Sequence, residues 1–272
     1  MKNTEHIRQA LARIKQFPPE RGYYLAFSGG KDSIVCYHLL KEAGVPFDAH
    51  FHITTVDPPE VIRFVREHYP DVQFDKPETT MWKLIPHKKM PPTRIARYCC
   101  EVFKEGHGDF RFVVTGVRWA ESVRRKLNRE EIEYDAYGSR GKRAIQNRKI
   151  FKHADNDTRR RMLENCAIIG KHILNPIIDW TDDQVWEFIH ERSLAYPVLY
   201  DQGFHRIGCI GCPMGRKQGM ERDFERYPKY KVAYLRAFQR LIDKGECTWN
   251  TPEEVMDWWM QVNKDGEGES EW

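Results

Sequence analysis

Apolar and polar positions follow two alternating periods along the first 190 or so residues of the chain. Short apolar runs, each with the length of a buried strand, occupy residues 23–27, 49–56, 72–74 and 112–115. Between these runs, apolar residues recur every three or four positions, as in 31–43 and 59–68, which is typical of helices with one buried face. Strands that alternate with helices predict an α/β fold in which helices cover both faces of a doubly wound parallel sheet.

The same periodicity predicts helices at both ends of this region. An amphipathic stretch over 7–17 precedes the first strand, and Thr181-Asp182-Asp183 is a helix start, because Thr and Asp favour the N-cap and first turn. Two further helices, over 228–244 and 252–262, are followed by a polar tail that we expect to be disordered. The adjacent Trp258 and Trp259 belong either to the core or to the contact of a homodimer.

Charge is distributed unevenly, although the 272 residues carry a formal net charge of only +4. Residues 118–161 hold 14 Lys and Arg against 7 Asp and Glu. We interpret 128–161 as a basic loop or lid suited to a polyanion, either a nucleotide or nucleic acid; the alternative is an ordinary solvated face. This loop belongs to an α/β domain over 1–195, and residues 196–272 form a cysteine-loop and helical extension packed with it as one unit.

No apolar run approaches the roughly 20 residues that a membrane helix needs, and the amphipathic start differs from a signal peptide. We therefore expect a cytoplasmic protein that has no membrane partner. The chain contains seven cysteines. In a reducing compartment these are better candidates for metal ligands or catalytic groups than for disulfides.

Five cysteines are candidate ligands of one metal centre. Cys209 and Cys212 form a close pair in one loop and are the strongest candidates, followed by Cys99 and Cys166. Cys100 is the weakest, because we expect adjacent side chains to diverge. Four thiolates suit a [4Fe-4S] cluster or a structural zinc ion; the alternative is a redox pair or unbound thiols.

The residues between the first strand and the first long helix predict an anion site. They are Ser28-Gly29-Gly30-Lys31-Asp32-Ser33. Glycines let backbone N–H groups approach a ligand, and a helix N-terminus favours phosphate. The two serine hydroxyls can donate hydrogen bonds, and the lysine adds a positive charge. The kinase-type phosphate loop requires a Gly-Lys-Ser/Thr tripeptide, which is absent from the sequence.

Polar or glycine residues also follow two other predicted strands. Thr54 ends the second run, and Thr115-Gly116 leads from the fourth run to Arg118. Since ligands bind at the carboxyl ends of parallel strands, we expect these residues and the 28–33 loop to share one nucleotide cleft.

The six-residue loop resembles the PP-loop of the ATP pyrophosphatase superfamily, whose members split ATP into AMP and pyrophosphate. Later motifs are similar to the phosphoadenosine phosphosulfate (PAPS) reductase family: Arg97-Tyr98-Cys99-Cys100 with Lys104, Thr115-Gly116-Val117-Arg118 with Arg125, Asn175 to Trp186, and Tyr200-Asp201 through Cys212. Together they cover about residues 23–215. The resemblance implies an adenine-nucleotide-binding α/β domain, and the cysteine pattern resembles that of iron–sulfur adenylylsulfate reductases.

We expect ATP with Mg²⁺, or alternatively PAPS or adenylylsulfate, to lie across the strand ends. The expected catalytic residues are Lys31, Asp32, Arg118 and Arg125. Asp32 either holds Mg²⁺ or caps the helix. Arg118 and Arg125, seven positions apart on one helical face, can grip phosphate or sulfate, and Glu121 is placed to orient Arg125.

The chain departs from sulfonucleotide reductases in two ways. Its loop is intact, whereas theirs is altered, and Glu246-Cys247-Thr248-Trp249 matches only two positions of their Glu-Cys-Gly-Leu/Ile-His tail. The leading hypothesis is therefore adenylation of an acceptor followed by sulfur transfer, with a sulfur or electron donor protein as partner. The alternatives are a reductase of PAPS or adenylylsulfate that uses Cys247, and a non-catalytic nucleic-acid-binding component of a larger system.

Overall fold

The computed structural model describes residues 4–108, 110–136, 170–245 and 247–262. Within these ranges, six strands form one sheet in the order β3-β2-β1-β4-β6-β5. The strands are β1 (Tyr23–Ala26), β2 (Phe47–His52), β3 (Gln73–Asp75), β4 (Phe112–Val114), β5 (Ile132–Ala136) and β6 (Gly170–Leu174). Neighbouring strands run parallel except at the β5 edge. The predicted α/β fold class is confirmed.

The edge strand β5 corrects part of the predicted loop. It lies at the start of the 128–161 segment and pairs antiparallel with β6, Ile132 opposite Leu174. The alternation of Ile132, Tyr134 and Ala136 with acidic residues is the strand pattern, but it is short and surrounded by charge. The rest of that segment, from residue 137, lies outside the described residues.

The first hydrophobic core lies on one face of the sheet. Tyr23 and Leu25 of β1 are fully buried there. The helices that contribute to this core are α1 (Glu5–Gln16), α2 (Lys31–Ala43), α3 (Pro59–His68) and α9 (Asp182–Glu191). Tyr24 faces the opposite side, where it packs with Val113 and Ile173. This alternation follows from the two-residue period of a strand.

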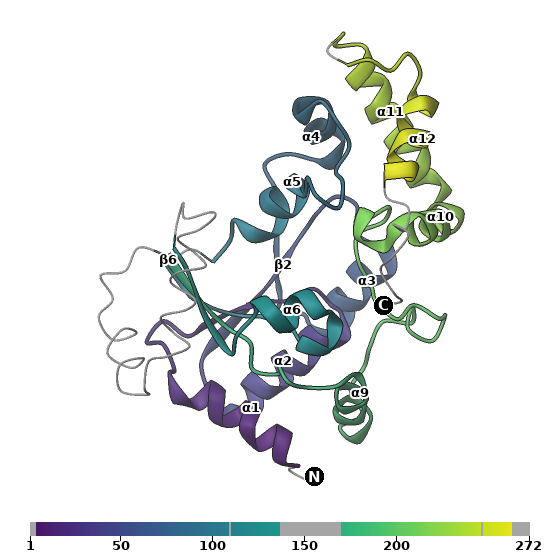
Figure 1. The fold of residues 1–272 in the computed structure, drawn as a ribbon. Coiled ribbons are helices and arrows are strands. Elements are labelled where there is room, and N and C mark those ends of the chain that lie inside the picture. The colour runs from purple at the N-terminus through teal and green to yellow at the C-terminus, as the bar shows by residue number, and fades with distance from the viewer. Residues whose placement is uncertain (1–3, 109, 137–169, 246, 263–272) are drawn as a thin grey trace.

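A second hydrophobic core joins segments far apart in the sequence. Its elements are α4 (Met81–Lys88), α5 (Tyr98–Cys100), the π-helical turn η1 (Glu101–Glu105), α10 (Arg216–Arg226), α11 (Pro228–Ile242) and α12 (Pro252–Val262). In Figure 1, α4 and α5 lie on the same side of the molecule as α11 and α12. Trp259 is fully buried here and donates to the Pro92 carbonyl at 2.5 Å, so it is a core residue; Trp258 is half-buried.

The parallel strands bring the predicted site residues to one edge of the sheet. β1 lies between β2 and β4, so the 28–33 loop, Thr54 and Thr115 follow three adjacent strands. None of the helices that the structure describes is long and apolar enough to cross a membrane.

Candidate functional site

The loop between β1 and α2 has a conformation that requires glycine. Gly29 has a φ of 72°, and a Cβ atom there would lie 2.8 Å from Val65 Cγ2 and 2.9 Å from Val61 Cγ1. A larger residue would therefore be strained and would clash with α3. The loop between β1 and α2 therefore packs closely against α3.

The N-terminus of α2 carries backbone N–H groups that suit an anion. Its N-cap is Gly30, which has no side chain to cap the first N–H groups. The Ser33 hydroxyl donates to the Gly30 carbonyl at 2.8 Å and accepts from the Ser28 N–H at 3.3 Å. These bonds fix the turn and leave the helix start facing the strand ends.

Four charged side chains form a network beside this helix start. Lys31 Nζ lies 3.0 Å from Asp182 Oδ1 and 3.6 Å from Asp32 Oδ2. Arg118 contacts the same carboxylates, through Nε to Asp32 at 2.6 Å and through Nη2 to Asp182 at 2.7 Å. Burial alone would raise the pKa of Asp182, but the hydrogen bond from Lys31 and the charge of Arg118 hold it below the usual value.

The network gives Asp32 a partner outside its own helix. Asp32 lies in the first turn of α2, and its carboxylate accepts from Arg118. Arg118 is 2% exposed and also donates to the Trp180 carbonyl at 3.2 Å. A buried guanidinium with three acceptors is a rigid element of the site.

Two residues after β4 have different roles. A Cβ atom on Gly116 would lie 2.9 Å from both the carbonyl carbon and the Cβ of Asp32, so this glycine allows the β4 end to touch α2. The hydroxyl of Thr115 donates to the Asn175 side chain. Thr115 therefore supports the site rather than facing it with a free hydroxyl.

The predicted helical alignment of Arg118 and Arg125 is wrong. The short 3-10 turn η2 (Trp119–Glu121) separates Arg118 from α6 (Val123–Asn128). Arg125 forms the predicted ion pair with Glu121. Burial, and then the charges of Arg206, Arg129 and Arg118, lower the pKa of Arg125 to about 10. The charge of Arg118 therefore acts on Arg125 despite the break in the helix.

Thr54 connects the strand ends to the cysteine loop. It is 1% exposed, its hydroxyl donates to Asp57 Oδ1 at 2.8 Å, and it accepts from Cys209 Sγ at 3.5 Å. The Ile210 N–H donates to the Val56 carbonyl at 2.7 Å. Burial raises the pKa of Asp57 despite its bonds to Thr54. The loop that carries Cys209 is therefore fixed to the end of β2.

The two cysteine pairs lie within electrostatic reach of one lysine. The negative charge of the Cys209 thiolate, followed by those of Cys212 and Cys100, raises the pKa of Lys104. The neighbouring thiols of Cys99 and Cys100 interact, and this interaction lowers the pKa of Cys100 and raises the pKa of Cys99. The ranking of Cys100 as the weakest ligand stays a prediction.

Two cationic side chains lie near the cysteines. Arg97 Nη2 lies 3.3 Å from Cys100 Sγ and, like Lys104, offsets thiolate charge. In the described part of the chain, no three His, Cys, Asp or Glu side chains are already arranged to hold a metal ion. Cys166 lies outside the described residues. Cys36, on α2, is fully buried in the first core.

Two contacts of the site were not predicted. Asp182 was interpreted only as part of a helix start, which it is: Thr181 caps α9 by accepting from the Gln184 N–H at 3.2 Å. Tyr200 Oη accepts from the Lys31 N–H at 2.9 Å, and burial raises the pKa of this phenol. The sequence signal for Tyr200 was its place in the family motif.

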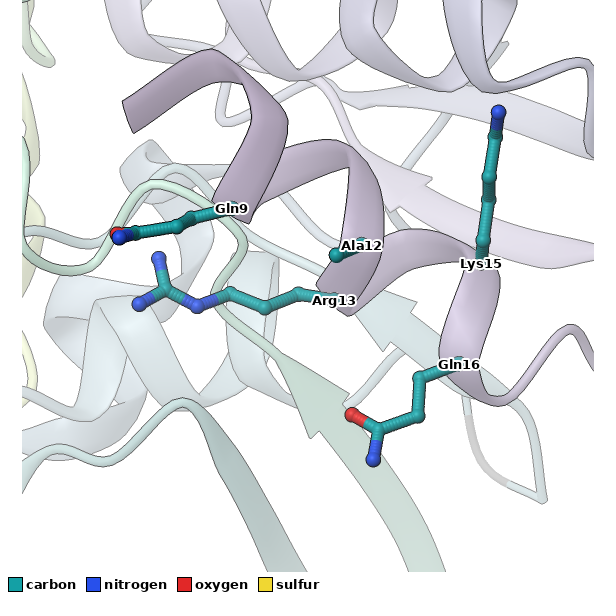
Figure 2. Close-up of a pocket in the computed structure, with 5 residues that line it drawn as sticks. All are labelled: Gln9, Ala12, Arg13, Lys15 and Gln16. Carbon is teal, nitrogen blue, oxygen red and sulfur yellow. The ribbon is translucent and has the colours of Figure 1, made fainter. Parts of the chain in front are cut away.

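A separate hollow lies along α1 (Figure 2). Its lining residues are Gln9, Ala12, Arg13, Lys15 and Gln16. None of them belongs to the predicted site, and Arg13 pairs with Asp179 at 2.7 Å. This hollow is therefore distinct from the predicted site.

Comparison with known proteins gives one matching family and several relatives. The profile of the phosphoadenosine phosphosulfate reductase domain family matches residues 22–214. An uncharacterized protein of Methanocaldococcus jannaschii is 28% identical over 229 residues, 82% of this chain and 43% of that protein. An adenosine 5'-phosphosulfate reductase of Geobacillus kaustophilus is 27% identical over 206 residues, 69% of this chain and 71% of that protein.

Among solved structures, a phosphoadenylyl-sulfate reductase from Candida auris in a phosphate complex has a TM-score of 0.46 and 18% identity, covering 76% of this chain and 88% of that one. The chain spans about half the length of the two Methanocaldococcus jannaschii relatives, of which it covers 43% and 55%.

Proposed function

Because the chain belongs to the phosphoadenosine phosphosulfate reductase domain family, we propose that it is an enzyme that binds ATP at the 28–33 loop and activates an acceptor by adenylation for sulfur transfer. The observation that supports this most is the intact loop at a helix start without a side-chain cap from Gly30, flanked by Lys31 and Arg118. That arrangement suits a departing diphosphate, which carries more negative charge than a single sulfate or phosphate group.

In the proposed reaction, an oxygen of the acceptor attacks the α-phosphorus of ATP. The bond to the bridging oxygen breaks, the acceptor is adenylated, and pyrophosphate leaves with that electron pair. Backbone N–H groups of Gly29 and Gly30, the Ser33 hydroxyl and the Lys31 ammonium stabilise the charge that develops on the leaving group. A sulfur nucleophile then displaces AMP from the acceptor carbon.

Asp32 and the two arginines have positioning roles in this proposal. Asp32 holds Arg118 through Nε, and its second oxygen, 3.6 Å from Lys31 Nζ, would exchange that lysine for the Mg²⁺ that accompanies ATP. Arg125, held by Glu121, is the candidate ligand of a second anionic group. Thr54, Thr115 and Gly116 support the walls of the cleft.

We further propose that Cys99, Cys209 and Cys212, with Cys100 or Cys166 as fourth ligand, hold a [4Fe-4S] cluster. When bound, such a cluster supplies a site for a sulfur atom or an anionic group. Thr54 would link this centre to the nucleotide cleft, since its hydroxyl oxygen lies 3.5 Å from Cys209 Sγ.

A reductase of adenylylsulfate or PAPS is the second candidate, because a relative carries that name. It would require a nucleophilic cysteine near the nucleotide. Cys247 is instead half-buried beside the second core, with its sulfur 4.0 Å from the Leu241 carbonyl and 3.9 Å from that of Trp249. The sulfur-transfer reaction therefore remains the preferred proposal.

One experiment separates these reactions. The protein is purified without oxygen, its iron and sulfide are counted, and it is incubated with ATP and candidate acceptors. AMP and pyrophosphate from the wild type and from Cys247→Ser, with none from Lys31→Met, would support the proposal. ADP as product would refute it, and sulfite from adenylylsulfate that is lost in Cys247→Ser would establish the reductase.

The cysteine assignment has its own test. We expect iron retention to be lost in Cys209→Ala and Cys212→Ala, whereas Cys36→Ala keeps it, because Cys36 is buried in the other core. Comparison of Cys100→Ala with Cys166→Ala identifies the fourth ligand. Full iron content in Cys209→Ala would contradict the proposed centre.

A further inference from the structure

One carboxylate oxygen stands between the two most buried cations of the site. Asp182 Oδ1 lies 3.0 Å from Lys31 Nζ and 2.7 Å from Arg118 Nη2. The cationic side chains are only 6% and 2% exposed, whereas the Asp182 side chain is 58% exposed. An oxygen that bridges two buried cations from the solvent side has the position expected of a ligand oxygen.

A second acceptor is present at the same helix start. Tyr200 Oη accepts from the Lys31 N–H at 2.9 Å, and the position of a Cβ on Gly30 would be 3.3 Å from that oxygen. The phenol thus lies directly over the first turn of α2, where an anion would be bound. Asp182 thus pairs with the Lys31 ammonium and the Arg118 guanidinium, and Tyr200 accepts from the Lys31 backbone N–H.

We propose that Asp182 Oδ1 and Tyr200 Oη occupy the positions of phosphate oxygens, and that a nucleotide must displace both to bind. Asp182 is then a specificity-determining residue, since it sets the negative charge that a ligand must bring. This inference rests on the nucleotide site of the proposed function but does not depend on the reaction performed there.

The physical reason is a competition between anions for the same cations. A ligand that replaces a carboxylate carrying one charge must offer stronger contacts than that carboxylate offers. Pyrophosphate and the diphosphate end of ATP carry several charges over neighbouring oxygens, whereas AMP carries a single phosphate. Asp182 therefore disfavours AMP more than pyrophosphate, which assists the release of AMP after turnover.

The geometry allows the exchange for Asp182 but not for Asp32. Asp182 is the first residue of α9 and can rotate into solvent without disturbing the Thr181 cap. Asp32 is 23% exposed and holds Arg118 from the α2 side, where it keeps the guanidinium oriented in both states. The two carboxylates thus have different tasks although they share one arginine.

The test measures binding in the absence of turnover. Isothermal titration calorimetry of the full chain with pyrophosphate, and separately with AMP, compares the wild type with Asp182→Asn. Asp183→Asn is the matched control, because Asp183 is exposed, neighbours Asp182 in the first turn of α9, and takes part in none of the ion pairs found among the described residues. It makes the same change in net charge.

We expect Asp182→Asn to bind pyrophosphate about tenfold more tightly than Asp183→Asn, with a larger gain for AMP. Tyr200→Phe should strengthen pyrophosphate binding by a few fold, because the Lys31 N–H loses its internal acceptor. An unfolding curve for each variant confirms that it is folded. If Asp182→Asn does not fold, Asp182→Ser takes its place.

Unchanged or weaker pyrophosphate binding in Asp182→Asn, relative to Asp183→Asn, would overturn the inference and would instead make Asp182 a direct or Mg²⁺-mediated ligand. If pyrophosphate binding behaves as expected but ATP yields no AMP, the proposed reaction fails while this inference stands.

Discussion

At the level of single residues, the site is built from close backbone contacts as much as from charge. Gly116 lies against the carbonyl carbon and Cβ of Asp32, so the strand end of β4 and the first turn of α2 are in direct contact. Arg118, two residues further on, reaches both Asp32 and Asp182 only because that contact is so close. Because Gly116 has no side chain, the 115–118 motif can lie directly against the 28–33 loop, although the two are far apart in the sequence.

Gly116→Ala should therefore destabilise the protein and weaken nucleotide binding. The added methyl would lie 2.9 Å from backbone and Cβ atoms, and overpacking of this kind costs about 1–3 kcal/mol. Urea unfolding and ATP binding measure the two effects. Gly219→Ala on α10 is the control, because a Cβ there meets nothing within 4 Å. Equal ATP affinity in wild type and Gly116→Ala would argue against this contact.

The sequence predicted the residues of the loop but not their partners. Ser28 to Ser33 are contiguous, so their glycines and the following helical pattern are visible together. The contacts of Lys31 with Asp182 and Tyr200 cross more than a hundred residues. Capping of α9 is enough to explain the sequence Thr181-Asp182-Asp183, so the pattern does not indicate that the Asp182 carboxylate also contacts Lys31 and Arg118.

At the level of elements, β2 separates an apolar face from a polar one. Ala49 and Phe51 enter the first core, whereas His50 and His52 lie on the opposite face near Asp75. Tyr24 Oη lies 2.9 Å from His52 Nε2. Burial lowers the pKa of His52 to about 4, so this histidine is neutral in the folded protein at neutral pH.

This shift predicts a loss of stability in acid. As the pH falls below about 6.5, His52 takes up a proton in the unfolded chain but not in the folded one until about pH 4. The free energy of unfolding should therefore fall across this window, by at most about 1.4 kcal/mol per pH unit for this group.

Urea unfolding at pH 7, 6 and 5 measures the effect. His52→Gln should have a shallower pH dependence than the wild type, and the exposed His87→Gln should not. The same slope in all three proteins would show that His52 is not the group responsible.

α10 and β5 are among the elements that the sequence pattern did not predict, and the reason can be identified for each. α10 buries only Met220 and Phe224 among many charges, so its apolar signal is a single pair four residues apart. β5 is a five-residue edge strand whose alternation is embedded in a basic segment. Long elements with many buried positions, such as α2 and α11, were predicted because their pattern repeats.

At the level of the whole molecule, the alternating pattern predicted the parallel sheet but not the composition of the second core. The spacing of apolar residues in α4 indicates that one face is buried, and it cannot indicate that α11 is what covers it. The order of the strands likewise follows from contacts that the sequence does not encode locally. The boundary predicted after residue 195 stays a prediction.

Trp259→Ala should test how far the second core supports the cysteine centre. Trp259 packs on Phe224 and Tyr234 and anchors the Pro92 carbonyl, which precedes Cys99 in the chain. Removing a fully buried tryptophan costs about 3–5 kcal/mol, so we expect lower thermal stability and reduced iron retention.

Trp258→Ala is the matched comparison, since that side chain is half-buried and contacts Trp249 at a ring distance of 5.0 Å. We expect Trp258→Ala to lose less thermal stability and less iron than Trp259→Ala. Full iron content in a folded Trp259→Ala protein would show that the cysteine centre does not depend on α12.

The mixed origin of the second core has a consequence for biosynthesis. Cys99 and Cys100 leave the ribosome long before Cys209, and Trp259, which ties the segment ahead of them to the last helix, emerges later still. The sheet and the 28–33 loop are complete in the nascent chain at a time when the second core does not yet cover Cys99 and Cys100. Loading of the proposed metal centre would therefore follow the synthesis of α12, and until then those thiols depend on the reducing capacity of their surroundings.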